Sequence, residues 1–291
     1  MSLTCTLLAG CRALWVAKVH VVMPWLFTGV FISTFMGCAS APAPLPPLKL
    51  QALEAETQGA RRFEQGRFEV AITQFKEAQR LNRSLDDEVG IARNLEHQAR
   101  SELAAGLPQA AQATLATISI AQRGINTGIL QAQAALGGQD FAAANTTLQD
   151  LRARCKACAQ TAAIAVLQAR VALAQSQADV AEKLLLTTLK PLAEQDEQRE
   201  LANAWRLLAQ AQAQQQRHTE ALASAQQALS LDRALGLPDK IAADWMLIAQ
   251  LHTPRDAALA RSAYTRAREV AQAAQLQAVV TQIDQRLKEI P

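Results

Sequence analysis

The sequence predicts an all-α protein, built as a superhelical solenoid of about six helical hairpins followed by a capping helix. Three observations support this prediction. Aromatic residues make up 4% of the 291 residues, while Ala, Leu, Gln and Arg are abundant, which favours helix over sheet. Apolar residues recur at spacings of three and four, which places them on one face of a helix. The whole pattern then recurs along the chain at a nearly fixed period, as expected for a repeat array.

The most regular pattern is a triplet of small or apolar residues that marks the second helix of each hairpin. Successive triplets begin 33 to 40 residues apart. The six triplets are Ala71/Phe75/Ala78, Ala111/Leu115/Ile118, Ala144/Leu148/Leu151, Ala181/Leu185/Thr188, Ala221/Ala225/Ala228 and Ala260/Tyr264/Ala267. Six hairpins therefore account for residues 52–276. Residues 277–291 form one more amphipathic helix, which we expect to cap the last hairpin.

A further motif marks the first helices of the last two hairpins. Trp205 and Trp245 are both followed, three and four residues later, by Leu or Ile and then by Ala. On a second helix, Ala71-x-x-x-Phe75-x-x-Ala78 places a small residue four positions before an aromatic one. This combination resembles the tetratricopeptide repeat and covers roughly residues 52–290. The resemblance implies a right-handed superhelix whose first helices line a groove for an extended peptide or a partner helix. An all-α array of another family with a similar period would show nearly the same residues.

Polar side chains are expected along this groove. Spacing from the packing residues places nine of them on the groove face of the first helices, including Glu96, Gln133 and Gln250. The six that we expect to contact a peptide are Arg93, Arg100, Arg170, Asn203, Arg206 and Gln210. Arg and amide groups can bond a peptide backbone or a carboxylate, although long polar side chains on a helix often do no more than face solvent. The Lys and Asn residues of the carboxylate clamp of chaperone-binding relatives are absent, because Glu56 and Ala60 stand at the corresponding positions.

Residues 1–37 have the layout of a secretory signal of the lipoprotein type. Arg12 and Lys18 precede residues 19–37, a largely apolar segment without any Asp, Glu, Lys or Arg. The segment ends in Phe35-Met36-Gly37-Cys38, which resembles the lipobox of bacterial lipoproteins and implies that Cys38 carries the lipid. The alternative is an uncleaved membrane anchor, because about 18 apolar residues are just enough to span a bilayer.

Residues 38–51 are predicted to be a tether between this segment and the solenoid. They contain four Pro, which fix φ and remove hydrogen-bond donors, so we expect extended chain rather than helix. Ala39 after the Cys resembles an outer-membrane sorting signal. The expected location is therefore the outer membrane, facing the periplasm, with an inner-membrane anchor as the alternative.

Cys155 and Cys158 form the one reactive-looking motif of the sequence. The favoured interpretation is a local disulfide that staples a turn in an oxidising compartment, and a redox pair is the alternative. Haem attachment would need His where Ala159 stands, and no further ligands lie at the spacing that zinc requires. His97, His218 and His252 are each isolated, and no catalytic constellation is found, so neither enzymatic activity, nor a metal, nor a cofactor is expected.

The charge of the chain adds little to these predictions. The formal net charge is +3, and Arg12 and Lys18 belong to the N-terminal segment, which leaves +1 for the rest of the chain. No basic stripe for nucleic acid is found.

Taken together, the repeats, the N-terminal segment and the lack of a catalytic constellation predict a scaffold that binds proteins or peptides and has no small-molecule substrate. We expect it to be anchored through Cys38 and to support assembly of an envelope complex such as secretion, pilus or outer-membrane machinery. The alternatives are a periplasmic accessory of cell-wall or redox chemistry acting through Cys155 and Cys158, and a structural spacer.

Overall fold

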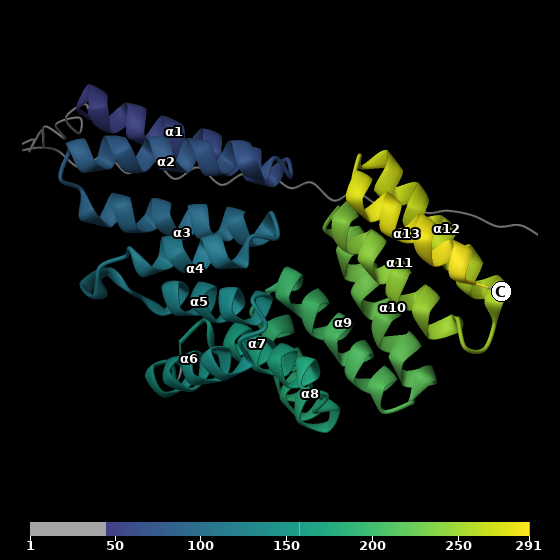
Figure 1. The fold of residues 1–291 in the computed structure, drawn as a ribbon. Helices are drawn as coiled ribbons and strands as arrows, with labels where there is room; N and C mark the ends of the chain where they lie inside the picture. The colour runs from purple at the N-terminus through teal and green to yellow at the C-terminus, as the bar shows by residue number, and fades with distance from the viewer. Residues whose placement is uncertain (1–44, 157, 291) are drawn as a thin grey trace, which may run out of the picture. The chain divides into compact units, whose positions relative to one another are not determined.

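The computed structural model describes residues 45–290 except residue 157, and these residues contain thirteen α-helices, one 3₁₀ helix and no strand (Figure 1). The first twelve α-helices pair into six hairpins and α13 follows, which confirms the predicted all-α solenoid. The helices are α1 (Pro47–Glu64), α2 (Phe68–Ser84), α3 (Glu88–Ala104), α4 (Pro108–Ala116), η1 (Ile120–Gln122), α5 (Ile125–Gly137), α6 (Phe141–Arg154), α7 (Thr161–Ala174), α8 (Ala178–Glu194), α9 (Gln198–Gln214), α10 (His218–Ala234), α11 (Pro238–His252), α12 (Ala257–Ala273) and α13 (Gln277–Glu289).

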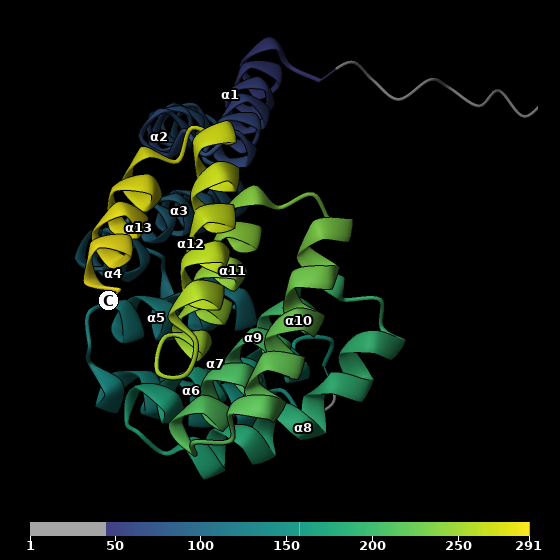
Figure 2. The ribbon, with the colours of Figure 1, turned by 90° about the vertical axis from the view of Figure 1, so that its right-hand side faces the viewer.

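The hairpins stack in chain order. Each helix packs on the next one along the chain, and the first helices also contact one another, α3 with α5, α5 with α7 and α7 with α9 (Figure 2). This is the contact pattern of a solenoid, in which a repeat touches its neighbours alone. At the C-terminal end, α13 packs on α12 and buries Val280 and Ile283, so it covers the face that a seventh hairpin would cover.

The predicted triplets form the core between the hairpins. The first member of each triplet has no exposed surface, and no member of the six is more than 5% exposed. Small residues let two helices approach closely, and the larger residue fills the space that remains. At the first hairpin the approach is so close that Gly59 of α1 faces the ring of Phe75, where a Cβ atom would lie 2.7 Å from the ring carbon Cε1.

Nine of the twelve junctions between described helices use the same turn. In the first, the N–H of Gly66 donates to the carbonyl of Phe63 and the N–H of Arg67 donates to that of Arg62, both at 2.9 Å. This pair of bonds is the Schellman motif, which needs one residue with positive φ. Gly supplies that residue three times and other residues six times, namely Gly66, Gly106, Gly236, Asp86, Gln139, Ser176, Asp196, Gln216 and Gln275.

The N-terminal boundary of the solenoid differs from the prediction. We predicted an extended tether as far as Gln51, and this is wrong for residues 47–51, because α1 begins at Pro47. Pro46 and Pro47 do not prevent this, since Pro at the first helical position has a suitable φ and needs no N–H donor. The predicted signal or anchor segment, the lipidation site Cys38 and the tether up to residue 44 lie outside the described residues. Among the helices described, none is both long enough and apolar enough to span a membrane.

Candidate partner-binding groove

A groove of about 1020 Å³ runs along the first helices of the third, fourth and fifth hairpins. Its walls come mainly from α5, α7 and α9, with Phe141 from the start of α6 and Lys240 from α11. Because each first helix contributes side chains to the lining, the groove extends across neighbouring repeats rather than sitting inside one of them. This shape suits an elongated ligand better than a compact one.

Apolar side chains make up much of the lining that α5, α6 and α7 contribute. Ile129, Leu136 and Phe141 are partly exposed there, Val166 and Leu167 lie beneath them as part of the core, and Gln133 and Arg170 add polar groups. The sequence explains how α7 reaches both the core and the groove, because it has apolar side chains around most of its circumference. A helix of that kind is expected where both sides are covered by protein.

The opposite side of the groove is polar and internally bonded. Asn203 Nδ2 donates to Glu200 Oε2 at 3.2 Å, and Arg206 Nη1 donates to Asn203 Oδ1 at 2.8 Å. Burial raises the pKa of Glu200, while its bond from Asn203 and the charge of Arg170 act in the other direction. These side chains stand on successive turns of α9, so they form a row facing α7.

Arg170 of α7 faces this row without a direct bond. Within the described part of the chain, its guanidinium has no hydrogen bond and no ion pair, although the charge of Glu200 is near enough to affect it. Much of its surface reaches solvent in the open groove, yet the walls on both sides desolvate the charged group. This desolvation lowers the pKa of Arg170 from its ordinary value, and Glu200 offsets part of the effect. Arg170 is therefore the cation of the groove that is available to a ligand.

Arg206, in contrast, is held by two carboxylates beneath the groove. Its Nε donates to Asp244 Oδ1 at 2.6 Å and its Nη2 pairs with Asp232, whose side chain is 2% exposed while that of Asp244 is fully buried. Asp244 Oδ2 has no hydrogen-bond partner. Burial raises the pKa of Asp244 to about 7, Arg206 opposes this shift, and the neighbouring charge of Asp232 adds to it. The cluster joins α9, α10 and α11.

The structure brings together four of the six predicted groove residues. Arg170, Asn203, Arg206 and Gln210 all line the groove, although Arg206 is committed to its carboxylate partners. The two residues predicted on α3, Arg93 and Arg100, do not line it. Arg93 Nε and Nη2 donate to Glu56 Oε1 and Oε2 of α1, both at 2.8 Å, so this arginine joins the first two hairpins instead.

Other residues in and beneath the groove were not predicted, although for some of them the helical spacing in the sequence indicates their position. Glu200 precedes Asn203, Leu207 and Gln210 at helical spacing, so it belongs to the same face of α9. Asp232 lies beneath the groove and does not line it, but its place four residues after Ala228 on the packing face of α10 indicates a buried ion pair. The sequence does not indicate that Lys240 and Phe141 line the groove. Both lie in the first turn of a helix, and where such a side chain points depends on the preceding turn.

The predicted cysteine pair lies at the junction between α6 and α7. The structure joins Cys155 and Cys158 in a disulfide with the two Cα atoms 5.2 Å apart. Cys155 is 2% exposed, and the carbonyl of Cys158 accepts a hydrogen bond from Thr161 Oγ1 at 2.8 Å. Among the described residues, no group of three or more His, Cys, Asp or Glu side chains is placed to hold a metal ion.

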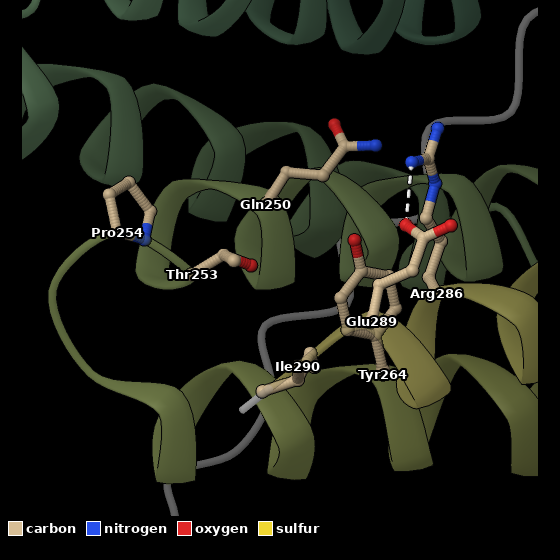
Figure 3. Close-up of a pocket in the computed structure, with 7 residues that line it drawn as sticks. All are labelled: Gln250, Thr253, Pro254, Tyr264, Arg286, Glu289 and Ile290. Atoms are coloured by element: carbon tan, nitrogen blue, oxygen red, sulfur yellow. Dashed lines mark hydrogen bonds and ion pairs between the residues drawn. The ribbon is translucent and has the colours of Figure 1, made fainter.

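A smaller pocket of about 440 Å³ lies where α11, α12 and α13 meet (Figure 3). The hydroxyl of Tyr264 points toward Gln250 inside it, and burial raises the pKa of this tyrosine. At the rim, Arg286 Nη1 donates to Glu289 Oε2 at 3.0 Å. Because these two charged side chains neutralise each other, the pocket offers less to a charged ligand than the groove, which holds Arg170.

No protein-family model matches the sequence, and no curated protein matches it. Solved structures with a similar fold include a Rap protein complexed with Competence and Sporulation Factor, at 12% identity and a TM-score of 0.61, over 83% of this chain and 71% of that chain. The Cut9 and Hcn1 hetero-tetramer of APC/C gives 15% identity and a TM-score of 0.62, over 80% of this chain and 43% of that chain. A Pyrococcus horikoshii signal-transduction ATPase with a tetratricopeptide repeat sensor gives 13% identity and a TM-score of 0.57, over 80% and 37%. The chain thus spans less than half of the last two, and its fold is tetratricopeptide-like.

Proposed function

We propose that this protein is a non-catalytic scaffold that binds a segment of another protein in the groove of α5, α7 and α9. The observation that carries the proposal is that partly exposed apolar side chains, Ile129, Leu136 and Phe141, lie in one groove with Arg170, a partly desolvated cation that no described residue pairs. Because the helices are already formed, binding does not have to order them, and this part of the entropic cost of association is avoided. The Rap neighbour, complexed with Competence and Sporulation Factor, is a precedent for a bound factor on this fold.

The groove chemistry suits a particular kind of segment. Apolar side chains would pack on Ile129, Leu136 and Phe141, which are partly exposed, and a carboxylate would pair with Arg170. Gln210 and Gln133 lie in the same groove and can bond the main chain of the bound segment. The favoured ligand is therefore an apolar segment of a protein that carries at least one acidic residue.

A charge reversal tests this proposal. The full-length chain captures partners from membrane extracts, and the affinity of each captured protein is then measured with Arg170→Glu and with Arg199→Glu. Arg199 is an exposed arginine of α9 that does not line the groove, so it is a matched control. A hydrogen-bonded charge pair contributes about 1.5–3 kcal/mol, so Arg170→Glu should weaken binding roughly tenfold to a hundredfold. Equal affinities for the two variants and the wild type would exclude the groove.

The location is part of the same proposal. We infer that Cys38 carries a lipid and places the solenoid on the periplasmic face of the outer membrane, with an inner-membrane anchor as the alternative. The lipobox-like Phe35-Met36-Gly37-Cys38 supports the anchor, and the Cys155–Cys158 disulfide is typical of an oxidising compartment. An anchored groove confines its partner to a membrane surface, which is what assembly of an envelope complex needs. Labelling with a fatty-acid analogue should mark the wild type and not Cys38→Ala.

The disulfide favours one second candidate function, an accessory role in redox chemistry through Cys155 and Cys158. In that case Cys155→Ser would abolish an activity measured with a disulfide or dithiol substrate, while the folded fraction stayed the same. A purely structural spacer, the third interpretation, predicts that no charge reversal in the groove changes any captured partner.

A further inference from the structure

The junction between the third and fourth hairpins is built differently from most of its counterparts. It is one of three junctions in the described chain without the Schellman turn, the others being α4–α5 and α11–α12. A disulfide between Cys155 and Cys158 is found here instead. Thr161, the first residue of α7, completes the junction, because its N–H and its Oγ1 donate to the carbonyl of Cys158 at 3.1 and 2.8 Å.

The disulfide belongs to the core that holds the two hairpins together. Cys155 is buried in a cluster with Leu148 and Leu151 of α6 and with Ile164 and Leu167 of α7. Leu167 belongs both to this cluster and to the groove. A movement of Cys155 would therefore displace Leu167 and, with it, part of the groove lining. The same junction sets how α7 lies against α5, and both helices form the groove.

The disulfide is also reachable from outside. Cys158 is partly exposed, and both sulfur-bearing residues line a surface pocket of about 420 Å³ together with Arg152 and Lys156. Cationic side chains and a following helix N-terminus favour a thiolate over a thiol. Thr161 Oγ1 lies 3.6 Å from Cys155 Sγ, close enough to hydrogen-bond the sulfur that leaves. These features are those of an exchangeable disulfide rather than of an inert one.

We propose that the Cys155–Cys158 disulfide is a redox clamp on the groove, which a protein or small-molecule dithiol opens. The proposal rests on the proposed function, because the groove is the site that it regulates. In the oxidised form the disulfide fixes α7 against the third hairpin and keeps the groove in its binding shape. In the reduced form the junction is free to move, and binding weakens.

The exchange balances as a two-electron transfer. One thiolate of the dithiol attacks Cys158 Sγ, a new sulfur–sulfur bond forms, and the bond to Cys155 breaks. Cys155 leaves as a thiolate and takes up a proton. The second sulfur of the dithiol then displaces Cys158, which takes up the other proton. The protein disulfide is reduced to two thiols, and the dithiol is oxidised to a disulfide.

The test measures distances across the groove in both redox states of the full-length chain. Genetically encoded fluorophores at Gln133 on α5 and Gln210 on α9 report on the groove. A second pair at Gln226 on α10 and Gln272 on α12, both exposed, is the control because the cysteine junction does not lie between them. Dithiothreitol should broaden or shift the groove distance and leave the control distance unchanged. The Cys155→Ser/Cys158→Ser variant should match the reduced wild type and should not respond to dithiothreitol.

A second measurement covers the case in which the double variant folds poorly. Hydrogen exchange at the α7 amides of the wild type should be roughly ten to thirty times faster after reduction. This range corresponds to the stabilisation that the loop-closure entropy of a disulfide loop this short predicts. Unchanged distances across the groove together with unchanged exchange in α7 would overturn the clamp. If no protein binds the groove in either redox state, the proposed function fails instead, while the distances still decide whether the clamp exists.

Discussion

Replacing Asp244 by Asn tests the buried charge cluster beneath the groove. Asp232 and Asp244 share one guanidinium, that of Arg206, so the three side chains carry a net negative charge when both carboxyls are ionised. Burying an uncompensated charge is costly, and the unpaired Oδ2 atom of Asp244 adds to this cost. Burial accordingly raises the pKa of Asp244 to about 7, against an ordinary value of 3.8. Burial also raises the pKa of Asp232, and the charge of Arg206 opposes this shift. Lys240 and Asp239 of α11 act on the pKa of Asp232 with opposite signs.

The sign of the pH effect follows from these two values. Between pH 3.8 and about 7 the folded protein holds a proton on Asp244 that the unfolded chain has released. The free energy of unfolding therefore falls as the pH rises through this window, and the contribution is constant above it. One pH unit corresponds to about 1.4 kcal/mol, so the interval from pH 5 to pH 7 contributes about 3 kcal/mol. Asn has the shape of the protonated acid and does not titrate. The wild type should therefore lose about 3 kcal/mol relative to Asp244→Asn between pH 5 and pH 8.

Urea denaturation followed by circular dichroism at pH 5, 6, 7 and 8 measures this difference. The control is Glu269→Gln, which removes an exposed carboxylate of α12 that does not belong to the cluster and should give a difference that does not vary with pH. Comparing each variant with the wild type at the same pH cancels the titration of the groups that lie outside the cluster. A difference between the wild type and Asp244→Asn that stays flat from pH 5 to pH 8 would refute the argument.

Two further substitutions test the packing and the turns. In Gly59→Ala the added methyl group would lie 2.7 Å from Phe75 Cε1, so we expect the free energy of unfolding to fall by about 1–2 kcal/mol, measured by urea denaturation. Gly124→Ala, whose methyl group meets nothing within 4 Å, has no such clash and should lose only about 0.5 kcal/mol, because Gly124 is the N-cap of α5 and Gly is preferred over Ala there. Gln275→Gly relieves a φ of 58° and should raise the melting temperature, corresponding to about 1 kcal/mol. Ala274→Gly next to it, at a φ of −87°, should lower the melting temperature, and a rise would contradict the turn argument.

Much of the fold could be predicted because the repeat pattern reports directly on packing. Residues such as Ala71, Phe75 and Ala78 are spaced to share one helix face, and burial of that face follows from the spacing alone. The boundary at Pro47 was less predictable, because Pro is compatible both with extended chain and with a first helical turn. The short α4 also carried no clear signal. It ends at Ala116, and Arg123 donates to carbonyls at its C-terminus, a long side-chain contact that spacing does not reveal.

The candidate groove could be predicted in part. Asn203 and Gln210 line the groove because the groove face of a first helix lies opposite its packing face, and their role in binding stays a prediction. Arg93 was assigned to the same surface, but its partner Glu56 lies 37 residues earlier in another hairpin. With repeat lengths that vary from 33 to 40 residues, the lateral register of neighbouring hairpins cannot be calculated from spacing. Helical spacing therefore indicates which face of each first helix a residue lies on, and the structure is needed to show which of these residues line the groove and which are bonded elsewhere.

Photo-crosslinking from inside the groove tests the central claim most directly. A crosslinking amino acid replaces Gln210, which lines the groove, or Gln226, an exposed glutamine on the second helix of the same hairpin. Cells that produce each full-length protein are irradiated, and crosslinked partners are identified by mass spectrometry. We predict that Gln210 captures a specific protein, that Arg170→Glu abolishes this capture, and that Gln226 does not capture it. Equal capture at both positions, or capture that survives Arg170→Glu, would contradict the assignment of this groove as the binding site.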